Sequence, residues 1–389
     1  MRVVINAQLD PERSGGIAQV ILGLAHSLGK LSGREEYVFV CSPSSAPWLE
    51  PYIGPNATIE VNAKKDAPPT TGVRRSDGFW ESFAPDVLHF PYQTYTRTDI
   101  PSVFNPHDLQ HLHLPELFTD AERARRENLF EQACRLAAAV VTASRFVKDD
   151  ILAHCPVRAE KVHVIGWAPP SAAYERPPHE TVDRVLRKHD LPDGFAIYPA
   201  QTWPHKNHRR LLEALHLLRE RHQAVIPLVC TGSTTEHFSE LARLADRLGL
   251  NEQVRWLGWV DATDLMALYH AARMMIVPTR FEAVSFPIFE AFLAGIPVAC
   301  SAVTSLPEQV GDAAILFDPL DVENMASAIS RLYKDGELRR TLATRGRDRL
   351  AQTSWTDVAE QYRAVYRQVA GSRDRSFIGS RVPASTHGG

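Results

Sequence analysis

The sequence predicts an α/β fold of two doubly wound, Rossmann-like domains that face each other across a cleft. Short apolar runs alternate with amphipathic segments along most of the 389 residues, and this alternation is typical of parallel sheets with helices on both faces. A proline-rich stretch interrupts it at residues 169–193, as expected for a linker that contains a short helix. A chain of this length has room for two to three domains of roughly 150 residues each.

The first domain is expected to span residues 1–168. Its first strand is predicted at Arg2–Ala7, and after a loop the apolar residues Ile17, Val20 and Leu24 recur at helical spacing. Further strands are predicted at 37–41, 86–90, 102–105, 139–143 and 162–165, and helices at 119–138 and 144–154.

The second domain repeats the pattern over residues 194–354. Strands are predicted at 195–200, 227–232, 254–258, 274–278, 297–301 and 313–317, and helices at 207–222, 235–248, 261–271, 286–294 and 321–334. The last residues, 372–389, lose all periodicity and are expected to form a flexible tail.

Composition and charge exclude several classes of protein. Lys and Arg number 43 against 46 Asp and Glu, a net charge of -3, so generic binding of nucleic acid is disfavoured. The five cysteines include no CxxC pair and are expected to be reduced thiols of a cytoplasmic protein. No apolar run reaches the ~18 residues that suggest a membrane-spanning helix, and the apolar stretch at the N-terminus is too short for a secretory signal.

Two carboxylates follow the strand predicted at 274–278, in the segment Thr279–Ala291. Pro287 favours the first turn of a helix, which places Glu282 in the loop and Glu290 in the helix. Backbone N–H groups near Val284, Ser285 and Phe286 are expected to be free for an anionic ligand, while the carboxylates suit sugar and ribose hydroxyls. The alternative is structural: Glu290 favours the helix N-terminus and Glu282 is a solvated loop charge.

A basic segment follows the first strand of the second domain. Asn207 is expected to be the N-cap of the next helix, which places Lys206 beside a helix N-terminus, where an anion such as a diphosphate is favoured. The positive charges of Arg209 and Arg210 oppose the helix dipole, a cost that an anionic ligand would offset. The alternative is an ordinary basic cluster on the surface.

Two loops of the first domain carry weaker signals. Gly15 and Gly16 allow close approach of a ligand to the backbone, although two glycines are also common in turns. His107 could donate a hydrogen bond into the cleft, although a lone histidine is often structural. The spacing of His107, His111 and His113 matches no standard zinc motif, so no metal site is predicted.

Taken together, these segments resemble the retaining nucleotide-sugar glycosyltransferases of family 4, also described as glycosyl transferases group 1, which have the GT-B fold. The order and spacing of the segments agree over about residues 1–370. The resemblance rests on Gly15-Gly16, His107-Asp108, Val141-Thr142-Ala143-Ser144, His205-Lys206-Asn207, Leu257-Gly258-Trp259-Val260, Glu282 and Glu290 in their context, and Ser305-Leu306-Pro307-Glu308.

The resemblance implies a role for each matching position. Glu290 is similar to the carboxylate that holds the ribose, and Val260 lies in the segment that receives the base. Glu282 is similar to the carboxylate on the donor sugar, His107 to the histidine near the anomeric centre, and Lys206 to the lysine on the diphosphate. The same comparison implies donor contacts at Gly15, Gly16, Val284, Ser285 and Phe286, and a helix at 355–371 that crosses back to the first domain.

The chain also departs from the family pattern. Many relatives have a Gly-Phe-Gly-like run after the first glutamate, where this chain has Ala283, Val284 and Ser285. Many carry an arginine a few residues before the lysine, where this chain has Gln201 and Thr202. The second cation for the diphosphate is therefore missing or comes from elsewhere, and the candidates are Arg280, His205 and Arg209.

The function implied is transfer of a hexose from a nucleotide-diphosphate donor, GDP-mannose-like or a UDP-sugar, to a hydroxyl of a glycan or lipid-linked glycan. Retention of configuration, no essential metal and no cofactor are expected, in the context of surface polysaccharide or lipopolysaccharide synthesis. The alternatives are a nucleotide-sugar epimerase or hydrolase on the same fold, or a non-catalytic protein that binds sugar nucleotides. Arg123, Arg125 and Arg126 form the one basic cluster of the first domain, so the membrane contact expected at the inner face is weak and peripheral.

Overall fold

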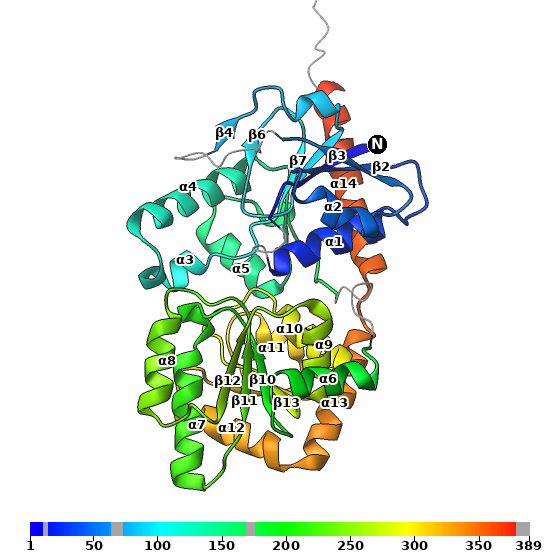
Figure 1. Ribbon diagram of the computed structural model, residues 1–389. Coiled ribbons are helices and arrows are strands. Elements are labelled where there is room, and N and C mark those ends of the chain that lie inside the picture. Colours follow the sequence, from blue (N-terminus) through cyan, green and yellow to red (C-terminus); the bar gives the residue numbers. More distant parts are fainter. Residues whose placement is uncertain (11–14, 64–72, 169–175, 379–389) are drawn as a thin grey trace, which may run out of the picture. The chain divides into compact units, whose positions relative to one another are not determined.

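The computed structural model describes residues 1–10, 15–63, 73–168 and 176–378, with side chains described up to residue 371. It divides into two compact units. Unit 1 comprises Met1–Leu112, Phe118–Trp167 and the C-terminal segment from Trp355, and unit 2 comprises His113–Leu117 and Ala168–Ser354. Each unit contains its own parallel sheet between helices (Figure 1).

Unit 1 is built on a parallel sheet in the order β3-β2-β1-β5-β7-β8-β9. The predicted strands are confirmed to within a residue or two, because their apolar runs are buried as expected. The strands are β1 (Arg2–Ala7), β2 (Glu36–Cys41), β3 (Ala57–Val61), β5 (Val87–Phe90), β7 (Ser102–Phe104), β8 (Ala139–Thr142) and β9 (Val162–Val164). A separate small sheet joins β4 (Arg74–Arg75) to β6 (Thr96–Arg97).

The helices of unit 1 cover this sheet. The predicted helices correspond to α1 (Gly16–Leu28), α4 (Asp120–Leu136) and α5 (Arg145–His154), and short α2 (Ala46–Leu49) and α3 (Gln110–His113) join them. The last helix, α14 (Trp355–Ile378), packs on α1, β5 and β7. Strand β3 was not expected, because it lies at the sheet edge and alternates weakly, with four of its residues at least partly exposed.

Unit 2 has a parallel sheet in the order β12-β11-β10-β13-β14-β15. The six predicted strands are confirmed, five of them with slightly shorter bounds and β12 with the predicted ones. They are β10 (Ala196–Pro199), β11 (Leu228–Thr231), β12 (Val254–Gly258), β13 (Met274–Val277), β14 (Val298–Ser301) and β15 (Ala314–Phe317).

Two groups of helices flank this sheet (Figure 1). In one group, α7 (His208–His222) packs on both α8 (Phe238–Arg247) and α12 (Val322–Lys334). In the other, α10 (Phe286–Ala294) packs on both α9 (Ala262–Ala271) and α13 (Gly336–Leu350), and α6 (His179–Lys188) packs on α9. The short helix α11 (Leu306–Val310) follows β14. Helix α13 was not predicted, because its sequence is rich in arginine and only weakly amphipathic.

The chain winds outward in both directions from the β10–β13 pair, because β11 and β12 lie on one side and β14 and β15 on the other. At such a switch in strand order, the loops after the two central strands run in opposite directions. Doubly wound proteins bind ligands in the crevice between these loops. In unit 2 these loops carry the lysine and the first glutamate identified in the sequence. Within the described residues we find no helix whose length and apolar character would let it span a lipid bilayer.

Candidate active site

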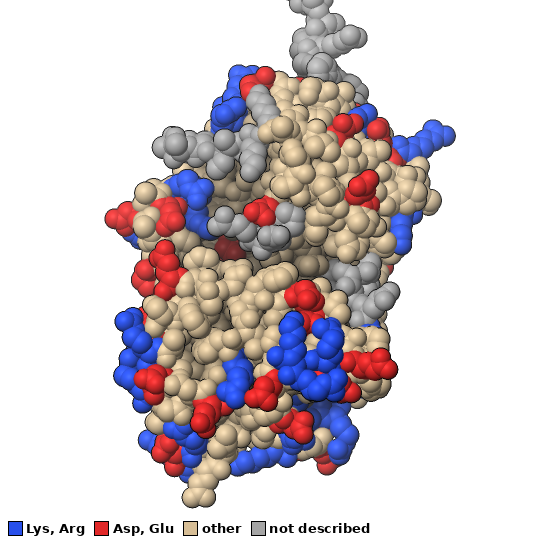
Figure 2. All heavy atoms as spheres, viewed as in Figure 1, with Lys and Arg blue, Asp and Glu red and all other residues tan. Residues whose placement is uncertain are grey.

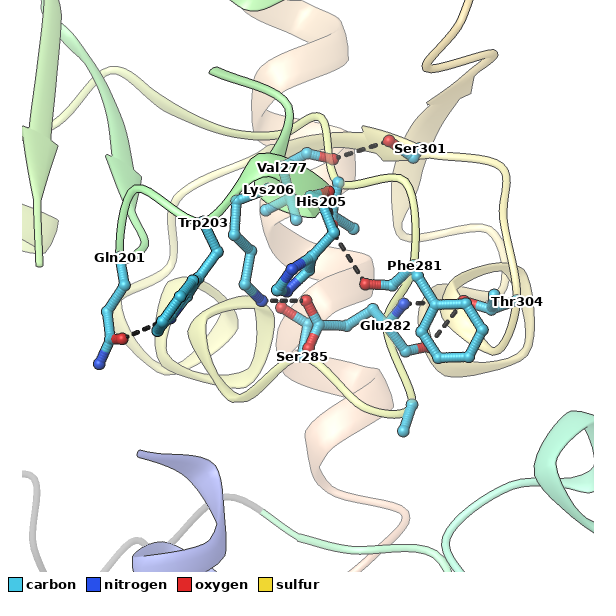
Figure 3. Close-up of polar contacts among 12 residues, drawn as sticks. Gln201, Trp203, His205, Lys206, Val277, Phe281, Glu282, Ser285, Ser301 and Thr304 are labelled. Carbon is cyan, nitrogen blue, oxygen red and sulfur yellow. Dashed lines mark hydrogen bonds and ion pairs between the residues drawn. The ribbon is translucent and has the colours of Figure 1, made fainter. Parts of the chain in front are cut away.

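Lys206 and Glu282 form a close ion pair at the switch point of unit 2. Lys206 ends a short 3₁₀ turn, η6 (Pro204–Lys206), and Glu282 lies in the loop after β13. The Lys206 Nζ lies 2.6 Å from Glu282 Oε2, and the side chains are only 21% and 17% exposed. A short charge-assisted hydrogen bond orients both groups. Figure 3 shows the two side chains pointing toward each other from separate loops.

The loops after β10 and β13 are tied together at the carbonyl of His205. The Arg280 backbone N–H donates to this oxygen at 2.7 Å, and the Thr279 hydroxyl donates to it at 3.2 Å. Tyr198, on β10, stabilises the same turn, since its hydroxyl donates to the Lys206 carbonyl at 2.8 Å. These hydrogen bonds to backbone carbonyls hold together the two loops that carry the lysine and the glutamate.

Asn207 is the N-cap residue of α7, as predicted, but its side chain does not make the usual capping hydrogen bond. Its backbone is left-handed, with φ 61°, and its side chain makes no bond to the helix N–H groups. The side-chain amide instead donates to the carbonyls of Pro278 and Pro319, both at 2.9 Å. Asparagine tolerates this conformation better than most residues, and here it links the β10 loop to two other loops of unit 2.

The loop that carries Glu282 is braced by the segment between β14 and α11. The Glu282 backbone N–H donates to Thr304 Oγ1 at 3.2 Å, and the hydroxyls of Thr304 and Ser305 donate to the Glu282 carbonyl at 2.6 and 2.8 Å. Gln309 accepts from the Ser285 backbone N–H at 2.9 Å and donates to the Ser285 carbonyl at 2.8 Å. The expectation that this stretch presents only free N–H groups is therefore wrong at Ser285.

The other donor-binding positions predicted in this stretch differ in exposure. Val284 is half-buried, while Phe286 opens α10 with its side chain buried. Val260 is partly buried and follows Trp259, which is 67% exposed after the end of β12. Gly258 has φ 66°, a left-handed conformation that glycine adopts without strain.

Glu290 lies inside α10 and is almost fully buried, at 6% exposure. The Tyr269 hydroxyl, from the neighbouring helix α9, donates to Glu290 Oε2 at 2.6 Å. Tyr269 is itself completely buried, so the bond fixes the direction of the carboxylate. Sequence reasoning missed Tyr269, because only the packing of α9 on α10 brings it to Glu290.

The candidate second cations are engaged or uncharged. Arg280 pairs with Glu116 at 2.8 Å. Arg209 pairs with Glu213 and Glu240 at 3.3 and 3.0 Å. Burial, with the nearby charge of Lys206, lowers the pKa of His205 to about 3, so its ring is neutral at pH 7. Lys206 is also paired, but its partner Glu282 belongs to the candidate site itself.

The predicted residues of unit 1 are placed as follows. Gly15 precedes α1 with φ 49° and ψ -125°, a conformation that suits glycine alone, and Gly16 begins the helix. His107 follows β7, is 6% exposed, and donates through Nε2 to the Pro91 carbonyl at 2.8 Å. Burial lowers its pKa to about 4, and its buried Nδ1 has no hydrogen-bond partner among the described residues.

The expectation that His107 donates into a cleft is therefore wrong, because its N–H is already used within unit 1. The nitrogen that remains is an acceptor in the neutral ring. Within the described ranges, no group of three or more His, Cys, Asp or Glu residues could hold a metal ion.

Both halves of the chain match known families. Residues 14–166 match Glycosyltransferase Family 4, and residues 182–349 match Glycosyl transferases group 1. The chain is 32% identical over 262 residues to an O-antigen chain mannosyltransferase B of Escherichia coli, a match that covers 67% of this chain and 68% of that protein. The chain belongs to glycosyltransferase family 4.

More distant relatives agree with this assignment. The glycosyltransferase is 27% identical over 241 residues to the serotype-specific mannosyltransferase WbdA of Escherichia coli, covering 61% of this chain and 28% of that longer protein. The crystal structure of Anabaena Alr3699/HepE in complex with UDP and glucose superposes with a TM-score of 0.73 at 18% identity, covering 95% of this chain and 100% of that chain. That likeness shows the GT-B fold predicted from the sequence.

Family membership confirms that the protein is an enzyme that transfers a sugar from a nucleotide-sugar donor to a glycan acceptor. Nothing in the comparisons supports the alternatives, an epimerase or hydrolase and a non-catalytic binding protein. Acidic and basic side chains are interspersed over the face of unit 2 in Figure 2, which fits a small anionic donor better than a polyanion.

Proposed function

We propose that the glycosyltransferase transfers mannose from GDP-mannose to a hydroxyl of a mannose-containing glycan, with retention of configuration, in surface polysaccharide synthesis. The names of the mannosyltransferase relatives support the sugar. The observation that carries the site assignment is the Lys206–Glu282 pair, 2.6 Å apart at the switch point. An anion and a set of sugar hydroxyls are the two ligands that this pair can receive together.

In this proposal, each residue of the site has a separate task. Lys206 neutralises the diphosphate as it leaves, since positive charge aimed at developing negative charge lowers the barrier. Glu282 accepts hydrogen bonds from hydroxyls of the donor sugar, and Glu290, held by Tyr269, accepts those of the ribose. The acceptor hydroxyl attacks from the face that the diphosphate leaves, and the departing phosphate takes its proton. No step needs a metal ion or a cofactor.

Three further assignments belong to the same proposal. Val260, with Trp259, receives the base, and the backbone of Gly15 and Gly16 approaches the diphosphate. His107 contacts the donor sugar through its free ring nitrogen. We place the enzyme in the cytoplasm, at most peripherally at the inner face of the membrane, where a lipid-linked acceptor would be reached.

The test is a transfer assay with the full chain, GDP-mannose or UDP-glucose as the donor and a synthetic mannose oligosaccharide as the acceptor. We expect transfer from GDP-mannose, unchanged by EDTA, and an α-anomeric linkage in the product by NMR. Lys206→Ala and Glu290→Ala should each lower kcat/KM roughly 100-fold or more, as for loss of an electrostatic contact in the transition state.

Lys334→Ala removes an exposed lysine on α12 of the same unit and should leave the rate unchanged. Undiminished transfer by the Lys206 and Glu290 variants would overturn the site assignment. Transfer from UDP-glucose alone would overturn the choice of donor, and donor breakdown without transfer would favour a hydrolase.

A further inference from the structure

Gln201 and Trp203 form a hydrogen-bonded pair in the loop that leads to Lys206. The indole Nε1 of Trp203 lies 2.7 Å from Gln201 Oε1. An indole nitrogen can only donate, so the oxygen of the amide must face the ring. The indole therefore fixes which way the amide of Gln201 is turned.

The consequence is that Gln201 presents its NH₂ group away from the indole. That group carries two donor hydrogens, and no acceptor for it is found within the part of the chain that the structure describes. Because its oxygen is already engaged, the amide can offer a ligand only donors. A ligand that meets it must supply acceptor atoms, as phosphate oxygens do.

The loop around the pair is held firmly. The Trp203 backbone N–H donates to the Gln201 carbonyl at 2.9 Å. The Thr202 side chain accepts from the Thr235 N–H at 2.7 Å, and the Thr235 hydroxyl donates to the Thr202 carbonyl at 2.9 Å. Gly232 adds a close backbone contact, since a Cβ built there would lie within 2.8 Å of backbone atoms of residues 200 and 201. The amide is thus positioned before any ligand arrives.

The pair lies beside the proposed phosphate contact. In Figure 3 the side chains of Gln201, Trp203 and Lys206 leave the loop on the same side, with Trp203 between the other two, and the Lys206 N–H donates to the Trp203 carbonyl at 2.9 Å. Trp203 is 49% exposed, so the pair lines a surface that a ligand can reach. Arg280 and Arg209, which could have supplied a second cation, are bound to glutamates.

We infer that Gln201 donates a hydrogen bond to the diphosphate of the donor, and that Trp203 positions its amide for this contact. A neutral donor thereby takes the place of a second cation in this enzyme. The inference rests on the proposed use of Lys206 as the diphosphate contact and adds a specific residue, with a specific atom, to it.

The test measures the affinities of GDP and GMP for the full-length protein by calorimetry and takes their ratio. Gln201→Ala should weaken GDP roughly tenfold, as for one hydrogen bond to a charged group, while GMP changes less. Gln201→Glu keeps an acceptor for the indole but replaces the donors with a carboxylate, and should weaken GDP more strongly. Trp203→Phe keeps an aromatic ring without the N–H, and it should also reduce the preference of the protein for GDP over GMP.

Gln223→Glu is the matched control, because it makes the same chemical change at the opposite end of α7. It should leave both affinities unchanged. If the wild-type protein binds neither GDP nor UDP, the proposed function itself fails. If the wild type binds GDP but Gln201→Glu binds it equally well, only the present inference is overturned. An unchanged ratio in Trp203→Phe would overturn the positioning role of the indole.

Discussion

His89 in unit 1 and His208 in unit 2 are both buried, but their ring nitrogens are treated in opposite ways. In unit 1, His89 Nε2 donates to Asn105 Oδ1 at 2.8 Å, and the Tyr366 hydroxyl donates to His89 Nδ1 at 2.8 Å. In unit 2, neither ring nitrogen of His208 has a hydrogen-bond partner among the described residues. Its ring packs instead against Tyr198 and Trp256, with centroids 4.6 and 5.7 Å away.

The difference shows what each buried ring does. His89 joins strand and helix, because Tyr366 belongs to α14 and Asn105 follows β7, and Asn105 also donates to the Tyr362 hydroxyl at 2.7 Å. The polar chain therefore fixes α14 in one register on unit 1. His208 follows the Lys206 loop at the start of α7 and packs as an aromatic ring. Because this ring is neutral, it adds no charge to the site.

The largest effect is expected for His89→Phe. The change leaves the Asn105 carbonyl and the Tyr366 hydroxyl buried without their partner, at a cost of about 1–3 kcal/mol for each group. We expect the free energy of unfolding to fall by about 2–6 kcal/mol in urea titrations at pH 7.5. The Tyr366→Phe change should cost less in the His89→Phe background than in the wild type, since its partner is already gone. Equal costs in both backgrounds would contradict the polar chain.

The next effect is the acid sensitivity of both units. Burial lowers the pKa of His89 to about 4 and that of His208 to about 3, whereas the unfolded chain has a value of about 6.5. Between these values the unfolded state binds more protons, so the free energy of unfolding decreases as the pH falls. Each histidine contributes a slope of up to about 1.4 kcal/mol per pH unit below pH 6.5.

The His208→Phe variant isolates the contribution of His208 in unit 2 to the acid sensitivity of the protein. Phenylalanine removes the titrating group without leaving a hydrogen-bond partner unpaired, so stability at pH 7.5 should change by less than about 1 kcal/mol. At pH 5 the variant should be more stable than the wild type by about 2 kcal/mol, which follows from the same slope over the interval. Urea titrations at the two pH values measure both quantities. A parallel loss of stability in variant and wild type would contradict the prediction.

The sequence was most informative where function and local pattern coincide. Strands β10 and β13 could be predicted from their apolar runs, and the loops that follow them contain Lys206 and Glu282. That these two side chains meet at 2.6 Å depends on the order of strands in the sheet, which periodicity does not encode.

The hydrogen bonds that connect those loops to other parts of unit 2 could mostly not be predicted. Thr304 supports Glu282 from another loop and has a left-handed backbone, with φ 51°, which threonine rarely adopts. The sequence predicts Asn207 as an N-cap, but its amide donates to the carbonyls of Pro278 and Pro319, which are distant in sequence. Contacts of this kind arise only from the three-dimensional arrangement, so a single sequence gives no local signal for them.

Tyr269 in unit 2 is the counterpart of Tyr366 in unit 1, since each donates its hydroxyl to a buried acceptor. Tyr366 serves the fold, whereas Tyr269 directs Glu290 at 2.6 Å. If Glu290 holds the ribose, Tyr269→Phe should reduce the preference for GDP over 2′-deoxy-GDP about threefold to tenfold, the range expected for one hydrogen bond. Calorimetry with both nucleotides measures this ratio, which a general loss of stability would leave unchanged. Tyr333→Phe, on α12 of the same unit, is the control and should keep the wild-type ratio, and an unchanged ratio in Tyr269→Phe would show that the tyrosine supports only the packing of α9 on α10.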